Sequence, residues 1–356
     1  MKMIVRRTAL AVCTLVLALI LPAAASAACT GFDDVPESAD CYESVIYLAK
    51  CEIAAGTGND CFSPEQLITV EQWAVMLCRA YGAETIGDSW QDVGRSSVVE
   101  AYRQGWLNET ALSAPRSPMC RSVLVESAFA AADVPVYDST LYEGGASLST
   151  ADNILRVGRE LGLCSDDADT NALVTRGDAA IILHVVLTQS FRIEEPPVPV
   201  TLVNAADVNV NDFLLELRKL PEQVLDAFNA AGWTYRIDFD YISELSNRLN
   251  MSCIGATNYS RKTIYISEAS AMLHEFGHFL DWMLGFPAEH EQLFRAEAAA
   301  APLRNYAKTN AREYFADCFA YWVKYAENAN AISLLQECAP MTYRYMEDLM
   351  RIANRL

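Results

Sequence analysis

The chain has 356 residues, of which 52% are hydrophobic and 21% are charged. This composition is that of a packed globular protein, so intrinsic disorder is excluded as its main state, and the length allows roughly two domains of about 150 residues. The formal net charge is −19. A surface this acidic repels phosphate backbones and anionic lipids, which excludes nucleic acids and membrane surfaces as expected partners.

The first 27 residues are expected to be a signal peptide. Three basic residues precede an apolar run over residues 8–21, and the small-x-small pattern Ala25-Ser26-Ala27 follows, which is typical of a signal-peptidase site. A retained membrane anchor is the alternative, but an anchor needs about 20 apolar residues, more than this run holds. We therefore expect a secreted mature chain that begins at Ala28 and has no membrane span.

Cysteine usage points to an oxidising compartment. Eleven cysteines are present, and removal of the leader with Cys13 leaves ten. No two of them are separated by two residues, so the paired knuckles of a zinc ribbon are absent from the sequence. An even number of cysteines in an exported chain predicts disulfide bonds, although the spacing leaves their pairing open.

Residues 28–190 contain three imperfect repeats. The first two open with Phe32-Asp33-Asp34-Val35 and Ser89-Trp90-Gln91-Asp92-Val93, and the third runs over residues 151–163. Each repeat continues through a small turn to a second helix start, where a threonine such as Thr69 or Thr175 can cap the first turn. A helix pair this small cannot bury its own apolar face, so we expect one all-α domain with a shared core.

These repeats resemble the S-layer homology module over about residues 32–190. The best matches are Phe62-Ser63-Pro64 in the first repeat and Thr175-Arg176-Gly177-Asp178 in the third. The resemblance implies binding to an acidic secondary cell-wall polysaccharide at a bacterial surface, with Arg121 and Arg176 as sugar-binding residues, because a guanidinium pairs well with a carboxylate. The first repeat has Val70 at this position.

A helical spacer that binds no sugar is the alternative for these repeats. Four aromatic residues are expected to belong to the core rather than to sugar platforms: Phe32, Trp73, Trp90 and Trp106.

A proline-rich linker is expected over residues 191–202, which include Glu195-Pro196-Pro197-Val198-Pro199. Proline lacks an amide donor and favours an extended, polyproline-type conformation. The linker is therefore stiff and marks the boundary to a second domain over residues 203–356.

The second domain contains the motif His274-Glu275-Phe276-Gly277-His278 in a stretch with helical apolar spacing. Positions i and i+4 share one helix face, so both imidazoles can bind one zinc ion at ~2.0–2.1 Å. Glu275 flanks that face and can reach a metal-bound water as the general base. A third protein ligand is needed, and a metzincin would have a histidine at the position of Leu284, so that class is excluded.

Glu313 and Asp317 supply a second i, i+4 pair, on an amphipathic stretch. Glu313 is the expected third ligand, and Asp317 is expected to accept the remaining N–H of a liganding histidine. A solvated acidic face is the alternative. Tyr306, seven residues before Glu313, is a neutral donor that can stabilise a developing oxyanion.

The motif 274–278, Tyr306 and the run from Glu313 to Phe319 together resemble the catalytic domain of anthrax lethal factor and its relatives, which include secreted Pro-Pro endopeptidases. The resemblance covers about residues 205–356. It implies one zinc ion held by His274, His278 and Glu313, with Glu275 as general base and Tyr306 as oxyanion donor. Asp317 stands where the family has glutamate, and Cys318 beside it leaves open a bridge to Cys338 or Cys253.

The expected fold class is α+β: an all-α three-repeat domain, then a mainly helical zincin-like domain with a small β-sheet. A helix is expected over residues 221–231 and a strand over 234–238. Residues 263–267 alternate like an edge strand, which in zincins pairs with extended substrate. Tyr265 then faces either the substrate or the core.

The expected function is that of a secreted, wall-attached zinc metalloendopeptidase of the gluzincin type. It would cut peptide bonds in extracellular or surface proteins, including Pro-Pro bonds in proline-rich linkers, with its own linker as one candidate. A plain tether is the alternative for that linker. For the whole chain, the alternative is an inactive surface adhesin with a degenerate peptidase fold.

Overall fold

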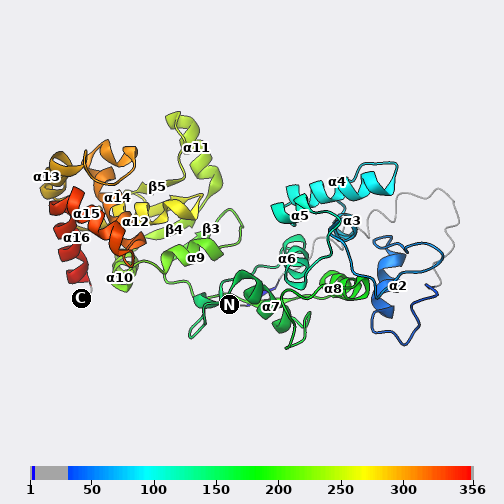
Figure 1. The fold of residues 1–356 in the computed structure, drawn as a ribbon. Helices are drawn as coiled ribbons and strands as arrows, with labels where there is room; N and C mark the ends of the chain where they lie inside the picture. Colours follow the sequence, from blue (N-terminus) through cyan, green and yellow to red (C-terminus); the bar gives the residue numbers. More distant parts are fainter. Residues whose placement is uncertain (1, 5–30, 354–356) are drawn as a thin grey trace. The chain divides into compact units, whose positions relative to one another are not determined.

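The computed structural model describes residues 2–4 and 31–353. The expected signal peptide therefore lies outside the described residues except for Lys2–Ile4. The chain divides into two compact units, Met1–Glu195 and Pro196–Leu356, and this division falls within the stretch 191–202. Both units are drawn in Figure 1. Helices dominate and a small sheet accompanies them, so the expected α+β class is confirmed.

Unit 1 is built from three pairs of longer helices, with a short helix and a 3-10 turn between them. In chain order these elements are α2 (Tyr42–Lys50), α3 (Val70–Tyr81), α4 (Trp90–Arg103), α5 (Glu109–Ser113), α6 (Arg121–Ala131), η1 (Ser139–Leu141), α7 (Thr150–Glu160) and α8 (Arg176–Thr188). The strand β2 (Arg192–Glu194) ends the unit and pairs antiparallel with β1 (Lys2–Ile4).

The second helices of the three pairs, α3, α6 and α8, start from segments that pair with one another. Isolated bridges join Leu67 to Thr175, Thr69 to Pro118, and Cys120 to Leu173. Thr69 and Thr175 cap α3 and α8 through their side chains, as the sequence predicts, whereas Cys120 makes no such cap on α6. The pairing brings the three helix starts together around one core.

The core of unit 1 includes Trp73, whose indole N–H donates to Ser127 Oγ at 2.7 Å and so links α3 to α6. Phe32 and Trp106 are only partly buried. Trp90 is 50% exposed, so its expected place in the core is wrong. Trp90 is the first residue of α4, directly after the capping Ser89, where the helix has only begun to pack.

Unit 2 places a small sheet among ten helical elements of the described chain. The helices are α9 (Asn211–Leu217), α10 (Glu222–Ala230), α11 (Phe239–Leu249), η2 (Ala269–Ala271), α12 (Met272–Met283), α13 (Ala288–Glu297), η3 (Asn305–Lys308), α14 (Ala311–Lys324), α15 (Ala329–Cys338) and α16 (Pro340–Ala353). The strands are β3 (Leu202–Asn204), β4 (Thr234–Ile237), β5 (Gly255–Asn258) and β6 (Thr263–Ile266). The helix and strand expected near 221–238 are confirmed as α10 and β4.

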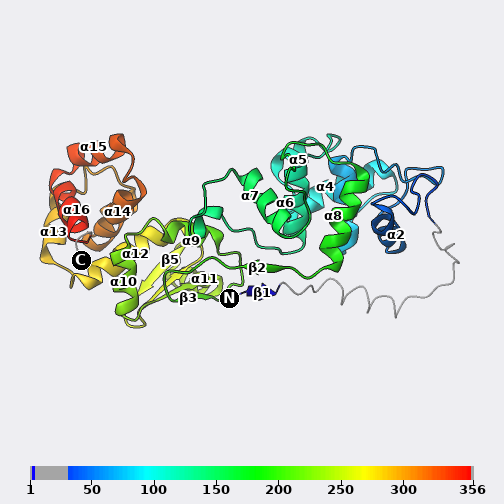
Figure 2. The same ribbon diagram turned by 90° about the horizontal axis from the view of Figure 1, so that it is seen from below.

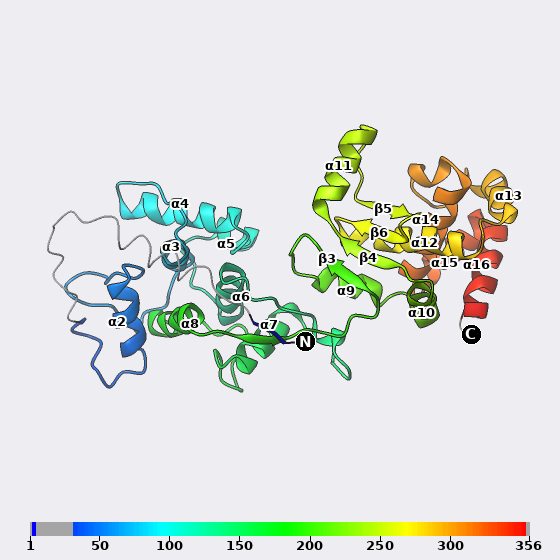
Figure 3. The ribbon, with the colours of Figure 1, turned by 180° about the vertical axis from the view of Figure 1, so that it is seen from behind.

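The sheet has the order β3-β4-β6-β5, in which β3, β4 and β6 are parallel and β5 runs antiparallel to β6. The expectation that 263–267 forms an edge strand is therefore wrong: β6 is internal, because β5 folds back beside it. Tyr265 is buried and stacks on Tyr241 with 3.7 Å between ring centroids. The edge next to the candidate site is β5, and Figure 3 shows the strands together with α12.

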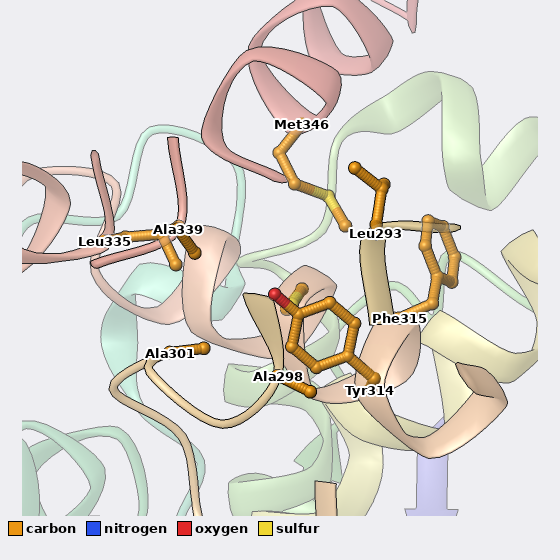
Figure 4. Close-up of a cluster of buried hydrophobic side chains, with 9 residues drawn as sticks. Leu293, Ala298, Ala301, Tyr314, Phe315, Leu335, Ala339 and Met346 are labelled. Carbon is orange, nitrogen blue, oxygen red and sulfur yellow. The ribbon is translucent and has the colours of Figure 1, made fainter. Parts of the chain in front are cut away.

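Helices α13 to α16 gather at one end of unit 2 (Figure 2). Their shared apolar cluster is drawn in Figure 4 and consists of Leu293, Ala298, Ala301, Tyr314, Phe315, Cys318, Leu335, Ala339 and Met346. Glu297 accepts hydrogen bonds from the backbone N–H groups of Met341 and Thr342, both at 2.8 Å, and so caps the start of α16. These contacts hold α14, the helix that carries Glu313, from its far side.

Disulfide bonds are not found among the described cysteines, all of which are free. Cys318 is fully buried in the cluster of Figure 4, where it packs as a small apolar side chain. Cys338 is the last residue of α15, and Cys253 lies in the loop before β5. The expected bridges, including one from Cys318, are therefore corrected for this part of the chain. Among the described residues no helix is both long and apolar enough to cross a membrane.

Candidate metal centre

Helix α12 carries His274, Glu275 and His278 on its buried surface. The four-residue spacing puts both imidazoles on one side, since side chains at i and i+4 share a helix face. Their Nε2 atoms lie 3.1 Å apart. The sequence pattern therefore produces the paired orientation that it predicts.

Helix α14 brings Glu313 to the same place. Asn310 caps this helix by accepting hydrogen bonds from the backbone N–H groups of Arg312 and Glu313, both at 3.1 Å. Glu313 therefore sits in the first turn, with its side chain toward α12. Glu313 Oε2 lies 3.1 Å from His274 Nε2 and 3.4 Å from His278 Nε2.

The two helices meet through a glycine. A Cβ atom added to Gly277 would lie 2.6 Å from Ala316 Cα and 2.7 Å from Ala316 O. Those atoms belong to the backbone of α14 and cannot rotate away. The glycine between the two histidines therefore sets the distance at which Glu313 reaches them.

The three ligand atoms have the spacing of a metal site. Tetrahedral zinc with bonds of about 2.0–2.1 Å separates neighbouring ligands by about 3.3–3.4 Å, close to the distances of 3.1, 3.1 and 3.4 Å between these three atoms. Glu313 Oε2 is buried and accepts no hydrogen bond with acceptable geometry. A buried carboxylate oxygen without a donor is costly, and a cation bound by His274, His278 and Glu313 removes that cost.

Asp317 fixes one of the two imidazoles. It lies one helical turn after Glu313, and its Oδ1 is 2.6 Å from His274 Nδ1. When Nδ1–H donates to this carboxylate, Nε2 carries the lone pair that a metal needs. His278 Nδ1 is buried and has no such partner among the described residues, so only one of the two imidazoles is oriented by a hydrogen bond to a carboxylate.

The electrostatics favour a cation. Burial lowers the pKa of His274, but the close carboxylates of Asp317 and Glu313 outweigh it and raise that pKa to about 9. Burial raises the pKa of Glu313, yet the close imidazoles of His274 and His278 hold it far below its usual range. The pKa of Asp317 is likewise lowered against burial, by His274 and Arg304. Both carboxylates therefore stay ionised around the two rings.

Glu275 is positioned by the edge strand β5. Thr257 Oγ1 donates a hydrogen bond of 2.7 Å to Glu275 Oε2. A Cβ atom added to Gly255 would lie 2.7 Å from Glu275 Oε1 and 2.9 Å from its Cγ, so the glycine leaves the space that this carboxylate occupies. Glu275 is thus buried beside the three ligand atoms, with one oxygen tied to the strand.

Tyr306 lies on η3, on the other side of the site. Its ring centroid is 6.3 Å from that of His274, and the residue is 42% exposed. Burial of the hydroxyl and the nearby Glu313 raise the pKa of Tyr306. The phenol therefore stays protonated at neutral pH and can donate a hydrogen bond.

One cavity of about 750 Å³ within unit 2 is lined by His274, Glu275, His278, Tyr306 and Glu313. Its walls also include Leu249, Met251 and Ile254. A cavity of this size is within the usual range for a ligand site.

Two family models match the chain. Residues 216–349 match the model of the anthrax toxin lethal factor, N- and C-terminal domain, and residues 31–72 match that of the S-layer homology domain. Unit 2 carries a lethal-factor-like domain. The suspected combination of an S-layer homology segment and a lethal-factor-like domain is confirmed. No curated protein matches the chain in sequence.

Sequence reasoning missed four residues of this lethal-factor-like site: Gly277, Gly255, Thr257 and Arg304. Gly277 lies inside the motif 274–278, and the absence of a side chain there was the one sign in the sequence that another helix could pack closely. Arg304 stands two residues before Tyr306 and forms a two-pronged ion pair with Asp317. Gly255 and Thr257 belong to a strand that neither periodicity nor a motif marks in the sequence.

The two arginines expected to bind sugar lie in unit 1, in different environments. Arg176 is 5% exposed, and it donates to the carbonyl oxygens of Phe62 and Ala55 at 2.9 and 3.1 Å. Arg121 is more exposed, and its Nη2 lies 3.6 Å from Asp178. Arg176 therefore supports the fold, while it also lines a cavity of about 520 Å³ that includes the exposed Trp90.

The helix crossing yields a first prediction. Gly277→Ala should lower stability by about 1–3 kcal/mol because the added methyl group overpacks the contact, and should weaken zinc binding by moving Glu313 away from the histidines. Thermal melting and competition with a chelator measure the two effects. Gly94→Ala is the matched control, since a Cβ there meets Glu71 only at 3.5 Å or more. Unchanged zinc affinity in Gly277→Ala would contradict the claim that the contact between α12 and α14 sets the distance from Glu313 to the histidines.

Proposed function

We propose that unit 2 is a zinc metalloendopeptidase of the gluzincin type. The observation that carries the proposal is the triangle of His274 Nε2, His278 Nε2 and Glu313 Oε2, with sides of 3.1, 3.1 and 3.4 Å. Three protein ligands leave the fourth tetrahedral position for water, which distinguishes a catalytic from a structural zinc site. The lethal-factor-like match supports the same chemistry.

A zinc ion held by His274, His278 and Glu313 would supply Lewis acidity toward a peptide carbonyl and would acidify a water molecule. Glu275 would accept a proton from the attacking water and deliver it to the leaving amine. Thr257 donates to Glu275 Oε2 and so restrains the carboxylate that serves as the general base. Tyr306 donates its hydroxyl proton in a hydrogen bond to the oxyanion of the tetrahedral intermediate.

The edge strand β5 supports a substrate that binds in extended form. It borders the cavity and pairs with β6 on one side only. Its other side can add a strand by backbone hydrogen bonds. Because Gly255 and Thr257 also hold Glu275, a peptide on this edge lies next to the general base.

Substitution of the two reacting residues tests the mechanism. Glu275→Gln should bind one zinc ion and lose turnover, because the amide cannot take a proton. Tyr306→Phe should keep its zinc and turn over more slowly, by about 10²–10³-fold. Zinc content by elemental analysis and cleavage of a proline-containing peptide library by mass spectrometry measure both. Chelation of the wild-type protein should abolish cleavage, and added zinc should restore it.

Full activity in Glu275→Gln would refute the assigned general base. A protein that holds zinc but cleaves nothing in the library would favour the alternative, an inactive adhesin with a degenerate peptidase fold. A protein that binds no zinc would overturn the metal site itself.

The proposal extends to Pro-Pro bonds in proline-rich linkers of extracellular or surface proteins. The support is the resemblance to Pro-Pro endopeptidases and the segment Glu195-Pro196-Pro197-Val198-Pro199 in the chain itself. Proline-rich segments adopt an extended conformation before binding, which lowers the entropy cost of docking on β5.

A peptide spanning residues 192–203 tests this specificity. The mature chain should cut it between Pro196 and Pro197, as mass spectrometry of the products would show. A peptide with alanine at both positions should remain intact, and the Glu275→Gln protein should cut neither. An intact Pro-Pro peptide, with other library members cleaved, would refute the specificity and keep the peptidase.

We further propose a signal peptide over residues 1–27, a wall-binding domain over 28–190, a linker over 191–202 and the peptidase over 203–356. The S-layer homology match indicates attachment to a bacterial cell surface. Secretion and binding to an acidic secondary cell-wall polysaccharide through Arg121 and Arg176 extend that attachment. Arg176 and Trp90 line one cavity, where a cation and an exposed ring suit a charged sugar.

Wall binding can be separated from folding with three variants of the mature chain. Arg121→Gln and Trp90→Ala should each reduce sedimentation with isolated bacterial walls without lowering the melting temperature. Arg176→Gln should also lower the melting temperature, because the carbonyl oxygens of Phe62 and Ala55 lose their donor. Wall binding unchanged in both Arg121→Gln and Trp90→Ala would refute the assigned sugar contacts.

A further inference from the structure

Arg304 forms a two-pronged ion pair at the wall of the cavity. Its Nε lies 2.7 Å from Asp317 Oδ2, and its Nη2 lies 2.7 Å from Asp317 Oδ1. Asp317 is buried, whereas the Arg304 side chain is 53% exposed. A planar guanidinium that holds both carboxylate oxygens restricts the carboxylate to one orientation.

The same carboxylate oxygen serves His274. Asp317 Oδ1 is 2.6 Å from His274 Nδ1, and Arg304 Nη2 is 3.1 Å from that nitrogen. Arg304 can only donate, and Nδ1 already donates to Asp317, so the Arg304–His274 approach is not itself a hydrogen bond. Arg304 acts on His274 through Asp317, which fixes the ring with Nε2 toward Glu313 and His278.

The other flank of the guanidinium packs on Tyr306. The Arg304 Cζ atom lies 5.4 Å from the centroid of the Tyr306 ring, within the range of a cation–π contact. Tyr306 is substantially exposed and sits on the short helix η3. One side chain therefore touches both the support of a metal ligand and the expected oxyanion donor.

We propose that Arg304 is a positioning residue of the metal centre: through Asp317 it orients His274 toward zinc, and through its own face it orients Tyr306. The inference rests on the proposed function, because it assigns Arg304 a task in that same site. A merely structural ion pair would contribute to stability and leave zinc affinity unchanged.

The test compares Arg304→Met and Arg304→Lys with the wild-type mature chain. Arg304→Met should weaken zinc binding by about 10–100-fold in competition with a chelator, the usual effect of losing a partner of this kind. With zinc in excess, kcat should fall while KM changes little, because Tyr306 acts on the oxyanion. The zinc affinity and kcat of Arg304→Lys should lie between those of Arg304→Met and the wild type, because a lysine ammonium cannot hold both oxygens of Asp317. Cobalt substitution should show altered absorption bands in Arg304→Met.

Arg351→Met is the matched control, because Arg351 forms an exposed ion pair with Asp348 at 2.7 Å on α16. It should leave zinc affinity, cobalt spectrum and kcat as in the wild type. Should Arg304→Met fail to fold, Arg304→Lys keeps a charge at this position and still must show weaker zinc binding.

The outcomes separate the two levels of the proposal. A wild-type chain that binds no zinc overturns the proposed function and this inference together. A wild-type chain that binds zinc and cleaves peptide, with Arg304 variants equal to it in zinc affinity, cobalt spectrum and kcat, overturns only the inference. A drop in melting temperature alone, with those readouts unchanged, also overturns it.

Discussion

Helices α12 and α14 cross so closely that only a glycine fits between the two histidines of α12. The would-be Cβ of Gly277 lies within 2.7 Å of the backbone of Ala316, and Ala316 itself lies between Glu313 and Asp317. This one contact fixes how far two carboxylates of α14 stand from two imidazoles of α12. The apolar cluster behind α14 supports this arrangement, because its side chains pack against the helix on the side away from α12.

Charge is the second constraint on the site, because the close crossing of α12 and α14 brings several carboxylates together. Glu313, Asp317 and Glu275 lie around two histidines in a chain with a net charge of −19. Three carboxylates so close together, of which those of Glu275 and Asp317 are buried, are unfavourable without cations. Arg304 compensates Asp317, and protons or a metal ion compensate Glu313 through the imidazoles. The excess negative charge therefore suits a cation at the centre, as the proposed metal site requires.

The sequence predicted the parts of the site that lie on helices. Residues at i and i+4 must share a face, so His274 with His278 and Glu313 with Asp317 could be paired before any coordinates. The sheet was less predictable, because strand order depends on how a chain folds back: β6 has the alternation of an edge strand, yet β5 covers it. The even number of cysteines wrongly predicted disulfide bonds among the described residues, because a count does not tell how far apart the thiols lie in the fold. Arg176 illustrates another limit, since a family's ligand-binding residue can also satisfy carbonyl groups inside the fold.

In the proposed peptidase, strand β5 would both bind the substrate and position Glu275, although no sequence pattern marked this strand. Gly255 has to lack a side chain because Glu275 occupies that space, and the Thr257 hydroxyl holds one oxygen of the same carboxylate. The free edge of β5 presents backbone groups to the cavity from these same residues. Under the proposed function, a peptide that pairs with this edge would lie against the strand that positions Glu275. Substrate binding and proton transfer would then depend on one structural element, so a change in β5 would affect both.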